Sequence, residues 1–113
     1  MATAALPLNS FKTKAVELTT DTATIYTTPE GVTTIVLGAQ ATNIGSAPVS
    51  VRFTLVKNNT NFIMLKDFEI PVNDAAEVTT GKLVIETGAS ITARAGANGS
   101  VNLVLSILET SNE

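Results

Sequence analysis

Residues 82–109, KLVIETGASITARAGANGSVNLVLSILE, constrain the fold of this chain more than any other stretch. Apolar residues alternate with polar ones in three short runs, and a glycine-containing turn separates each run from the next. An alternation with a period of two predicts a half-buried β-strand, and short glycine turns between such runs predict antiparallel neighbours. The last run is the most apolar. Its predicted inward row is Val101, Leu103, Leu105 and Ile107.

The rest of the chain repeats this pattern, and helical periodicity is nowhere sustained. Runs at 14–19, 22–28, 32–43, 49–56 and 62–70 have the alternation, apolarity or β-branched composition of strands, and turns at 29–31, 43–48 and 57–61 lie between them. About eight or nine short strands with such spacing predict an all-β antiparallel sandwich, either immunoglobulin-like or jelly-roll. We expect an N-terminal arm over 1–13, a sandwich domain over 14–109 and a polar tail over 110–113.

Two runs carry specific expectations about the faces of their strands. In the run 32–43, Ile35, Leu37, Ala39 and Ala41 are predicted to share the inward face, and a glycine at position 38 suggests a bulge or a close backbone approach. The run 62–70 is apolar on both faces at its start. Phe62, Met64, Phe68 and Ile70 are predicted to share one face, with Ile63 and Leu65 on the other, so this strand is covered or lies at an interface.

Composition favours a protein that lives in an assembly. Hydrophobic residues make up 44% of the 113 residues, but charged residues only 15%, against roughly 25% in an average soluble domain. Exposed charge keeps neighbouring molecules apart, so a charge-poor surface favours association. The formal net charge is −3 and the seven Lys and Arg residues are scattered, which argues against a nucleic-acid partner. No run approaches the ~18 apolar residues that cross a bilayer, so no membrane is expected.

No residue constellation identifies a reaction. The chain has no His and no Cys, which removes the ordinary general bases, thiol nucleophiles and zinc ligand sets. We therefore expect no enzyme and no cofactor. Asp67 and Glu69, with Asp74 and Glu77 in the next loop, could serve a glycosidase or hold a calcium ion. A solvated strand face is the alternative that we favour for these carboxylates. The glycine-rich segment 96–99 has no following Lys-Ser/Thr and helix, so it is interpreted as a turn.

Four segments carry a resemblance to a known group of proteins: 25–36 (IYTTPEGVTTIV), 81–86 (GKLVIE), 88–93 (GASITA) and 104–109 (VLSILE). In these segments the chain resembles small virion structural proteins of tailed bacteriophages, in particular those of phages that infect cyanobacteria. The likeness covers about half of the chain and consists of turns and strands. It implies a β-sandwich subunit of a phage particle and supplies no catalytic residues.

From these observations we expect a capsid decoration or cement protein that binds major capsid protein as a homo-oligomer. It would be assembled in the host cytoplasm and located in the virion. The alternative is a subunit of the tail, neck or fibre, which could bind a host glycan. A carbohydrate-binding module is disfavoured because the chain has no Trp and one Tyr. The candidate partner contacts are Leu6, Leu8, Phe11, Ile63, Leu65, Val104 and Leu108.

Overall fold

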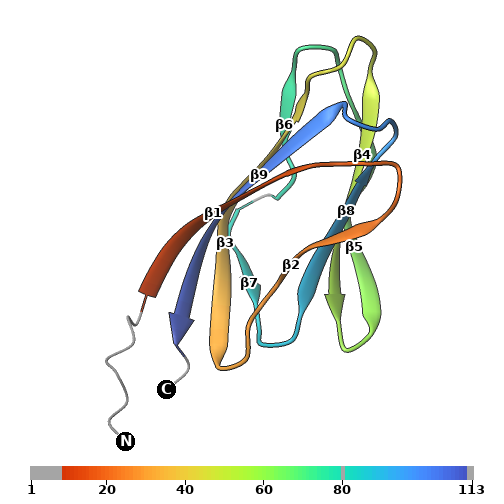
Figure 1. The fold of residues 1–113 in the computed structure, drawn as a ribbon. Coiled ribbons are helices and arrows are strands. Elements are labelled where there is room, and N and C mark those ends of the chain that lie inside the picture. The colour runs from red at the N-terminus through yellow and green to blue at the C-terminus, as the bar shows by residue number, and fades with distance from the viewer. Residues whose placement is uncertain (1–8, 80, 112–113) are drawn as a thin grey trace, which may run out of the picture.

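The structure is a computed structural model that describes residues 9–79 and 81–111, all of which lie in strands, turns or loops. Within these residues, nine strands follow one another (Figure 1). They are β1 (Asn9–Glu17), β2 (Ala23–Thr27), β3 (Val32–Asn43), β4 (Val49–Lys57), β5 (Thr60–Ile70), β6 (Ala75–Glu77), β7 (Leu83–Ile85), β8 (Ser90–Ala95) and β9 (Val101–Ser111). The antiparallel β-sandwich expected from the sequence is confirmed.

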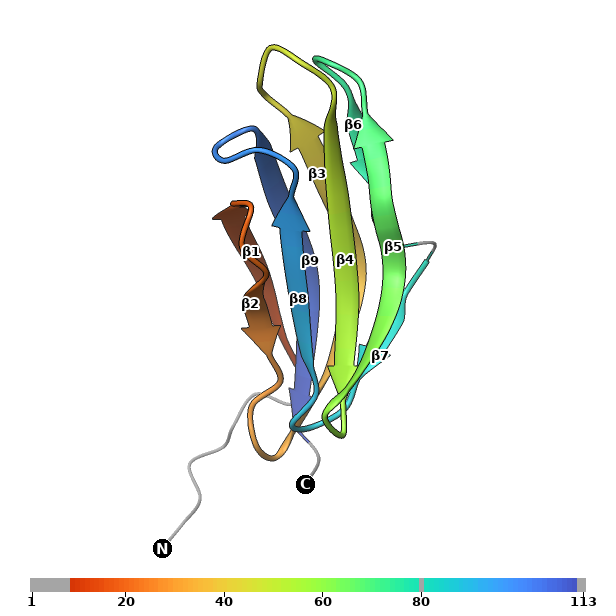
Figure 2. The same ribbon diagram turned by 90° about the vertical axis from the view of Figure 1, so that its right-hand side faces the viewer.

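The strands form two antiparallel sheets that face each other (Figures 1 and 2). Sheet A has the order β1-β9-β3, with β6 and β7 both pairing with the far side of β3, and sheet B has the order β2-β8-β4-β5. The pairs are nested: β1 with β9, β2 with β8, β3 with β6 and β7, and β4 with β5. This nesting is that of a long hairpin wound into a sandwich. The fold is therefore a jelly roll, and the immunoglobulin-like alternative is excluded.

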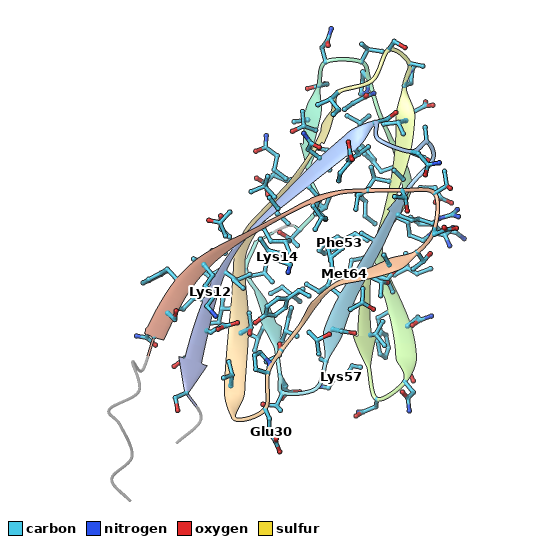
Figure 3. The ribbon with its side chains drawn as sticks, viewed as in Figure 1. Lys12, Lys14, Glu30, Phe53, Lys57 and Met64 are labelled. Carbon is cyan, nitrogen blue, oxygen red and sulfur yellow. The ribbon has the colours of Figure 1, made fainter. Side chains whose placement is uncertain are left out.

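The core lies between the two sheets and consists of the inward rows of the central strands. Figure 3 shows Phe53 of β4 between the sheets, and this side chain is fully buried. The predicted inward row of β9 is confirmed, since Val101, Leu103, Leu105 and Ile107 are all buried. No disulfide links the two sheets, because the chain contains no cysteine.

A bulge in β3 reverses the phase of that strand. Its pairing with β9 shifts register between Val36 and Gly38, which confirms the irregularity expected at the glycine. The extra residue places Val36 inward before the bulge and Ala39 inward after it, three positions apart. The prediction that Ile35 and Leu37 point into the core is therefore wrong: Ile35 is half-buried and Leu37 is exposed.

Two further bulges change the faces of β5. Its pairing with β4 shifts register on both sides of Phe53. Asp67 adopts a left-handed backbone conformation, with φ of 51°. Leu65 lies opposite the buried Phe53 and packs against the core. Its predicted outward position is therefore wrong. Ile63 lies opposite Thr54 on the outer face of sheet B, as expected for its phase.

Three of the four side chains expected in the inward row of β5 lie there, but the position of the strand limits their burial. The fourth, Met64, falls in the bulge between Ile63 and Leu65 and lies opposite no residue of β4. Phe62, Phe68 and Ile70 lie opposite Leu55, Val51 and Val49, which belong to the inward row of β4. Ile70 is fully buried, whereas Phe62 and Phe68 stay about half exposed. The reason is that β5 is the edge strand of sheet B, with a neighbour on one side only.

The strand limits differ from the predicted domain limits at both ends. The predicted arm reaches residue 13, but β1 begins at Asn9 and pairs with β9 from Asn9 opposite Thr110 onward. Likewise, β9 continues to Ser111, two residues beyond the predicted end of the sandwich. The backbone hydrogen bonds of the ladder hold these polar residues in strands although their side chains give no strong alternation. Residues 1–8 of the predicted arm lie outside the described residues.

A polar network joins the two sheets near the end of β9. The Lys12 Nζ lies 2.8 Å from the Glu109 carboxylate, and the Tyr26 hydroxyl of sheet B donates a hydrogen bond of 2.5 Å to the same carboxylate. The Tyr26 and Thr34 hydroxyls also hydrogen-bond, at 2.7 Å. The Glu109 side chain is only 10% exposed. A carboxylate this buried requires such partners.

Candidate interaction surface

An apolar row crosses the outer face of sheet A. In the ladder, Phe11 of β1 lies opposite Leu108 of β9, Leu108 opposite Ile35 of β3, and Ile35 opposite Val84 of β7. Residues directly opposite in antiparallel strands project from the same face of the sheet. These four side chains therefore form a continuous row across four strands, and we call it the apolar row.

The apolar row is open to solvent at both ends. Phe11 is 73% exposed and Val84 is 57% exposed, while Leu108 and Ile35 between them are half-buried by their neighbours. Val104, which is 40% exposed, extends the apolar surface along β9. Monomeric soluble proteins rarely expose contiguous apolar patches of this kind unless the patch contacts a partner.

The outer face of sheet A also lacks positive charge. Its outward strand positions in the described chain carry Thr, Ser, Asn, Gln and Ala around the apolar row, with Glu17 and Glu77 as the charged residues. Lys12 and Lys14 of β1 belong to the opposite face, because they pair with the buried Ile107 and Leu105 (Figure 3). Little desolvation of charge would therefore oppose the docking of a partner on this face.

The edges of the sheets are less suited to association than this face. The edge strand β5 is interrupted by two bulges, and β2 is short and bulged between Thr24 and Tyr26. The edge at β6 and β7 consists of two strands of three residues each. Along β1, which pairs without a register shift, Lys12 and Lys14 point toward the core side at the open edge. Short strands, bulges and inward-pointing charges all discourage edge-to-edge pairing.

The structure brings together three of the predicted contact residues. Phe11, Val104 and Leu108 share the outer face of sheet A. Ile63 lies on the outer face of sheet B, on the opposite side of the sandwich, and Leu65 packs against the core. The expected surface that combined Ile63 and Leu65 with Val104 and Leu108 is therefore wrong. Leu6 and Leu8 lie outside the described residues.

Two residues of the apolar row were missed from the sequence. Val84 had a signal, since Leu83 and Ile85 were expected to share one face and Val84 lies between them. Alternation gave no signal for Ile35, because the bulge at Gly38 exchanges the inward and outward faces of β3 between its two halves. The row exists because the ladder places strands from both halves of the chain side by side.

The outer face of sheet B has a different chemistry. Thr24, Thr92 and Thr54 lie opposite one another across β2, β8 and β4, with Arg94 and Arg52 as the next pair. The Asp67 carboxylate binds Arg52 through two hydrogen bonds, of 3.2 Å to Nε and 2.7 Å to a terminal nitrogen. These hydrogen bonds hold the pKa of Asp67 below its usual value. This face is thus hydroxyl-rich and carries the arginines.

The carboxylates considered for a cation site do not converge. Within residues 9–79 and 81–111, no group of three or more acidic residues is arranged to hold a metal ion. Asp67 is engaged by Arg52, and the Asp74 carboxylate accepts a hydrogen bond from the backbone N–H of Ala75, at 2.8 Å. In the same ranges, no helix has the length and apolarity to span a membrane.

Comparisons with known proteins identify the fold and not a family. No family model and no curated protein sequence matches the chain. Among solved structures, the chain is similar to a chain of the Bacillus endospore appendages, which are disulfide-linked pili, with a TM-score of 0.57 and 10% identity over 100% of both chains. It is also similar to a chain of the T13 IBDV viral particle, with a TM-score of 0.55 and 9% identity over 93% of this chain and 31% of that chain. At such identities the likeness shows a shared β-sandwich fold.

Proposed function

We propose that this chain is a non-enzymatic structural subunit of a virus particle, and specifically a capsid decoration protein that binds major capsid protein. The observation that carries the proposal is the apolar row, an exposed hydrophobic surface on a rigid sheet face without positive charge. The partner would dock across the outer face of sheet A, and Phe11 and Val84 would be the side chains that lose most solvent exposure.

Three observations support a place in a virion. The chain shares its fold with a chain of the T13 IBDV viral particle. Its turn and strand motifs resemble those of small tailed-phage virion proteins, and its charged fraction of 15% suits a protein that stays in an assembly. The absence of His and Cys from the sequence disfavours most catalytic alternatives.

A decoration protein can act with modest contacts. Full burial of a Val or Phe side chain stabilises a complex by roughly 1.5–3 kcal/mol relative to full exposure, and the gain is smaller for residues already partly covered. A single subunit would therefore bind weakly through this face. Because a shell presents many equivalent sites, and because oligomerisation would link several subunits, the combined attachment is much stronger.

The test uses particles that lack the protein, with purified protein added back. Phe11→Ser and Val84→Ser should each lower occupancy on particles about tenfold, which corresponds to about 1.4 kcal/mol, and should leave the free energy of unfolding nearly unchanged. Ile44→Ser is the matched control, because Ile44 is 50% exposed in the turn between β3 and β4, outside the apolar row. Occupancy is measured by quantitative mass spectrometry of sedimented particles. Full occupancy by both apolar-row variants would exclude this face as the attachment surface.

The second candidate is a subunit of the tail, neck or fibre that binds its own copies or other virion proteins. Its specific support is the likeness to a pilus chain over 100% of both chains. Disulfide linkage of the kind found in those pili is excluded here, because this sequence has no cysteine. Immunogold labelling of intact particles separates the two candidates: label confined to the tail or neck would replace decoration of the head.

A further inference from the structure

Two arginines lie side by side on the outer face of sheet B, directly opposite each other in adjacent strands. Arg52 of β4 and Arg94 of β8 are partners in the ladder. Like charges in this arrangement destabilise a sheet unless an anion lies between or beside them. Asp67 supplies one carboxylate, so two guanidinium groups and one carboxylate leave a net charge of about +1 at this place.

The carboxylate of Asp67 serves mainly one of the two arginines. It makes two hydrogen bonds with Arg52, whereas its nearest oxygen lies 3.8 Å from a terminal nitrogen of Arg94, beyond hydrogen-bond distance. The side chain of Arg94 makes no hydrogen bond with any described residue. Its side chain is 40% exposed, so its planar set of N–H donors is available to a second carboxylate.

The backbone of β5 is shaped to present Asp67 to this pair. Among the described non-glycine residues inside strands, Asp67 alone has a positive φ, of 51°. The other three described non-glycine residues with a positive φ lie in turns, and they are Asn58, Asn59 and Asn73. A left-handed conformation costs free energy for an aspartate, and such conformations gather at binding sites. Here the bulge holds one carboxylate against Arg52 and leaves Arg94 open.

A shallow hollow of about 100 Å³ lies at the arginine pair. Hydroxyl and amide side chains line it together with both arginines, and Ile63 supplies an apolar side. The lining residues include Thr22, Thr54, Asn61 and Thr92. The hollow has room for one carboxyl group with its nearest carbons and opens to solvent. The hydroxyls can donate further hydrogen bonds to the carboxylate oxygens. Glu69 is on the same face, opposite Ser50, and makes no ion pair with either arginine.

We propose that this hollow is a carboxylate-binding site in which Arg94 receives an acidic side chain of a partner polypeptide. We call it the Arg94 site. It is separate from the apolar row, which lies on the other face of the sandwich. The inference rests on the proposed function for the nature of the partner, since a virion subunit contacts neighbouring polypeptides. The affinity of the site for a carboxylate can be measured on the isolated chain.

The experiment is a titration of the isotope-labelled chain with sodium acetate, followed by NMR of the arginine side-chain N–H groups and of the Thr92 amide. Sodium chloride at the same ionic strength is the reference. Acetate should produce saturable shifts at Arg94 that chloride does not. Arg94→Gln should weaken acetate binding about tenfold, the effect of losing one charge-assisted pair. Asp67→Asn should strengthen it several-fold, because Arg52 is then released to bind the acetate.

Lys66→Gln is the matched control, since it removes one positive charge from the residue that precedes Asp67. It should change acetate binding less than twofold. Thermal melting of each variant verifies the fold, and Arg94→Lys, which keeps the charge but loses the planar donors, should bind more weakly than wild type. Equal shifts with acetate and chloride, or an unchanged affinity in Arg94→Gln, would overturn the proposal.

Two further ligands distinguish the sources of the carboxylate. A capped tripeptide with a central glutamate should bind at least as tightly as acetate, because its side chain presents the same group from a backbone. Glucuronate should bind more weakly than the peptide, because its polar ring gains little from contact with Ile63, whereas the methylene groups of a glutamate side chain can pack there. Tighter binding of glucuronate than of the peptide would overturn the assignment to a polypeptide. Failure of these titrations leaves the particle-binding result on the apolar row unaffected, and the reverse also holds.

Discussion

At the scale of single residues, Leu105 shows how much of this protein depends on one side chain of β9. It is 1% exposed and lies between Lys14 of β1 and Ala39 of β3 in the ladder. Neither neighbour can replace the contact that Leu105 makes with the facing sheet, because Ala39 is small and Lys14 lies in the edge strand. A cavity at this position could not be filled by small shifts of these neighbours.

We therefore expect Leu105→Ala to lower the free energy of unfolding by roughly 2–5 kcal/mol. Val104→Ala, one residue earlier on the exposed face, should lower it by less than about 1 kcal/mol. Urea denaturation followed by circular dichroism measures both. A similar loss for the two variants would mean that the inward row of β9 does not form the core.

Asn43 shows that the residue type alone does not decide whether a polar side chain is buried or solvated. Its place in the turn segment 43–48 was predicted from composition. In the structure it is 1% exposed, its amide donates to the carbonyls of Ala47 and Ile70, and its side-chain oxygen accepts from the N–H of Gly45. Asparagine in a turn is common and usually solvated. Its burial here follows from the end of β5, which lies 27 residues later in the chain.

At the scale of elements, β1 is the edge strand whose protection depends on charge. Its ladder with β9 is regular, so no bulge disrupts its free edge. Lys12 and Lys14 lie on its core-facing side, where an incoming strand would have to bury them. Lys12 is also held by Glu109, which leaves Lys14 as the residue to test.

Lys14→Val should increase aggregation of the folded protein, because it replaces the inward charge with a strand-forming apolar residue next to a free edge. Static light scattering against concentration at neutral pH measures the effect. Thr27→Val is the control, since it adds the same side chain to another edge strand, β2, on the outer face of sheet B. If Thr27→Val aggregates as much as Lys14→Val, added hydrophobicity alone is the cause and the charge of Lys14 does not protect the edge of β1.

The bulges are the elements that sequence patterns described least well. The glycine at position 38 signalled the bulge in β3, but not that Val36 replaces Ile35 and Leu37 on the inward face. In β5, the run from Ile63 to Leu65 carries no glycine and gave no signal for a bulge. One inserted residue exchanges the two faces of a strand beyond it. Alternation therefore predicted strands well and their faces only up to the nearest bulge.

At the scale of the whole molecule, the network of Lys12, Glu109, Tyr26 and Thr34 ties sheet A to sheet B. The hydrogen bonds from Lys12 and Tyr26 hold the pKa of Glu109 below its ordinary value of 4.5. Burial, and then the hydrogen bond to Glu109, raise the pKa of Tyr26 from 10.0 to about 12. Both shifts link the cohesion of the two sheets to pH.

The two pKa shifts affect the free energy of unfolding at opposite ends of the pH range. The contribution of Glu109 is present above its unfolded pKa near 4.5 and is lost as the pH falls through its lower folded pKa. The contribution of Tyr26 is present below pH 10 and is lost as the pH rises toward 12. Glu109→Gln should therefore cost most stability near pH 7 and less in acid, while Tyr26→Phe should flatten the alkaline loss.

Urea denaturation at fixed ionic strength from pH 3 to pH 11 measures these profiles. Glu30→Gln, in the exposed turn between β2 and β3, is the control for the removal of one negative charge. A stability difference between wild type and Glu109→Gln that stays constant across the acid range would show that the carboxylate does not couple the sheets.

The sequence by itself determined the all-β class, the turns and most strand positions, including both ends of β3 at Val32 and Asn43. These features depend on local chemistry: alternation, β-branching and the φ preferences of Gly, Pro and Asn act between residues close in the chain. Only the tertiary structure decided the jelly-roll order, the inward position of Leu65 and the apolar row. These features depend on register between strands that are distant in sequence, and register is fixed by bulges and by the burial of a whole sheet face at once.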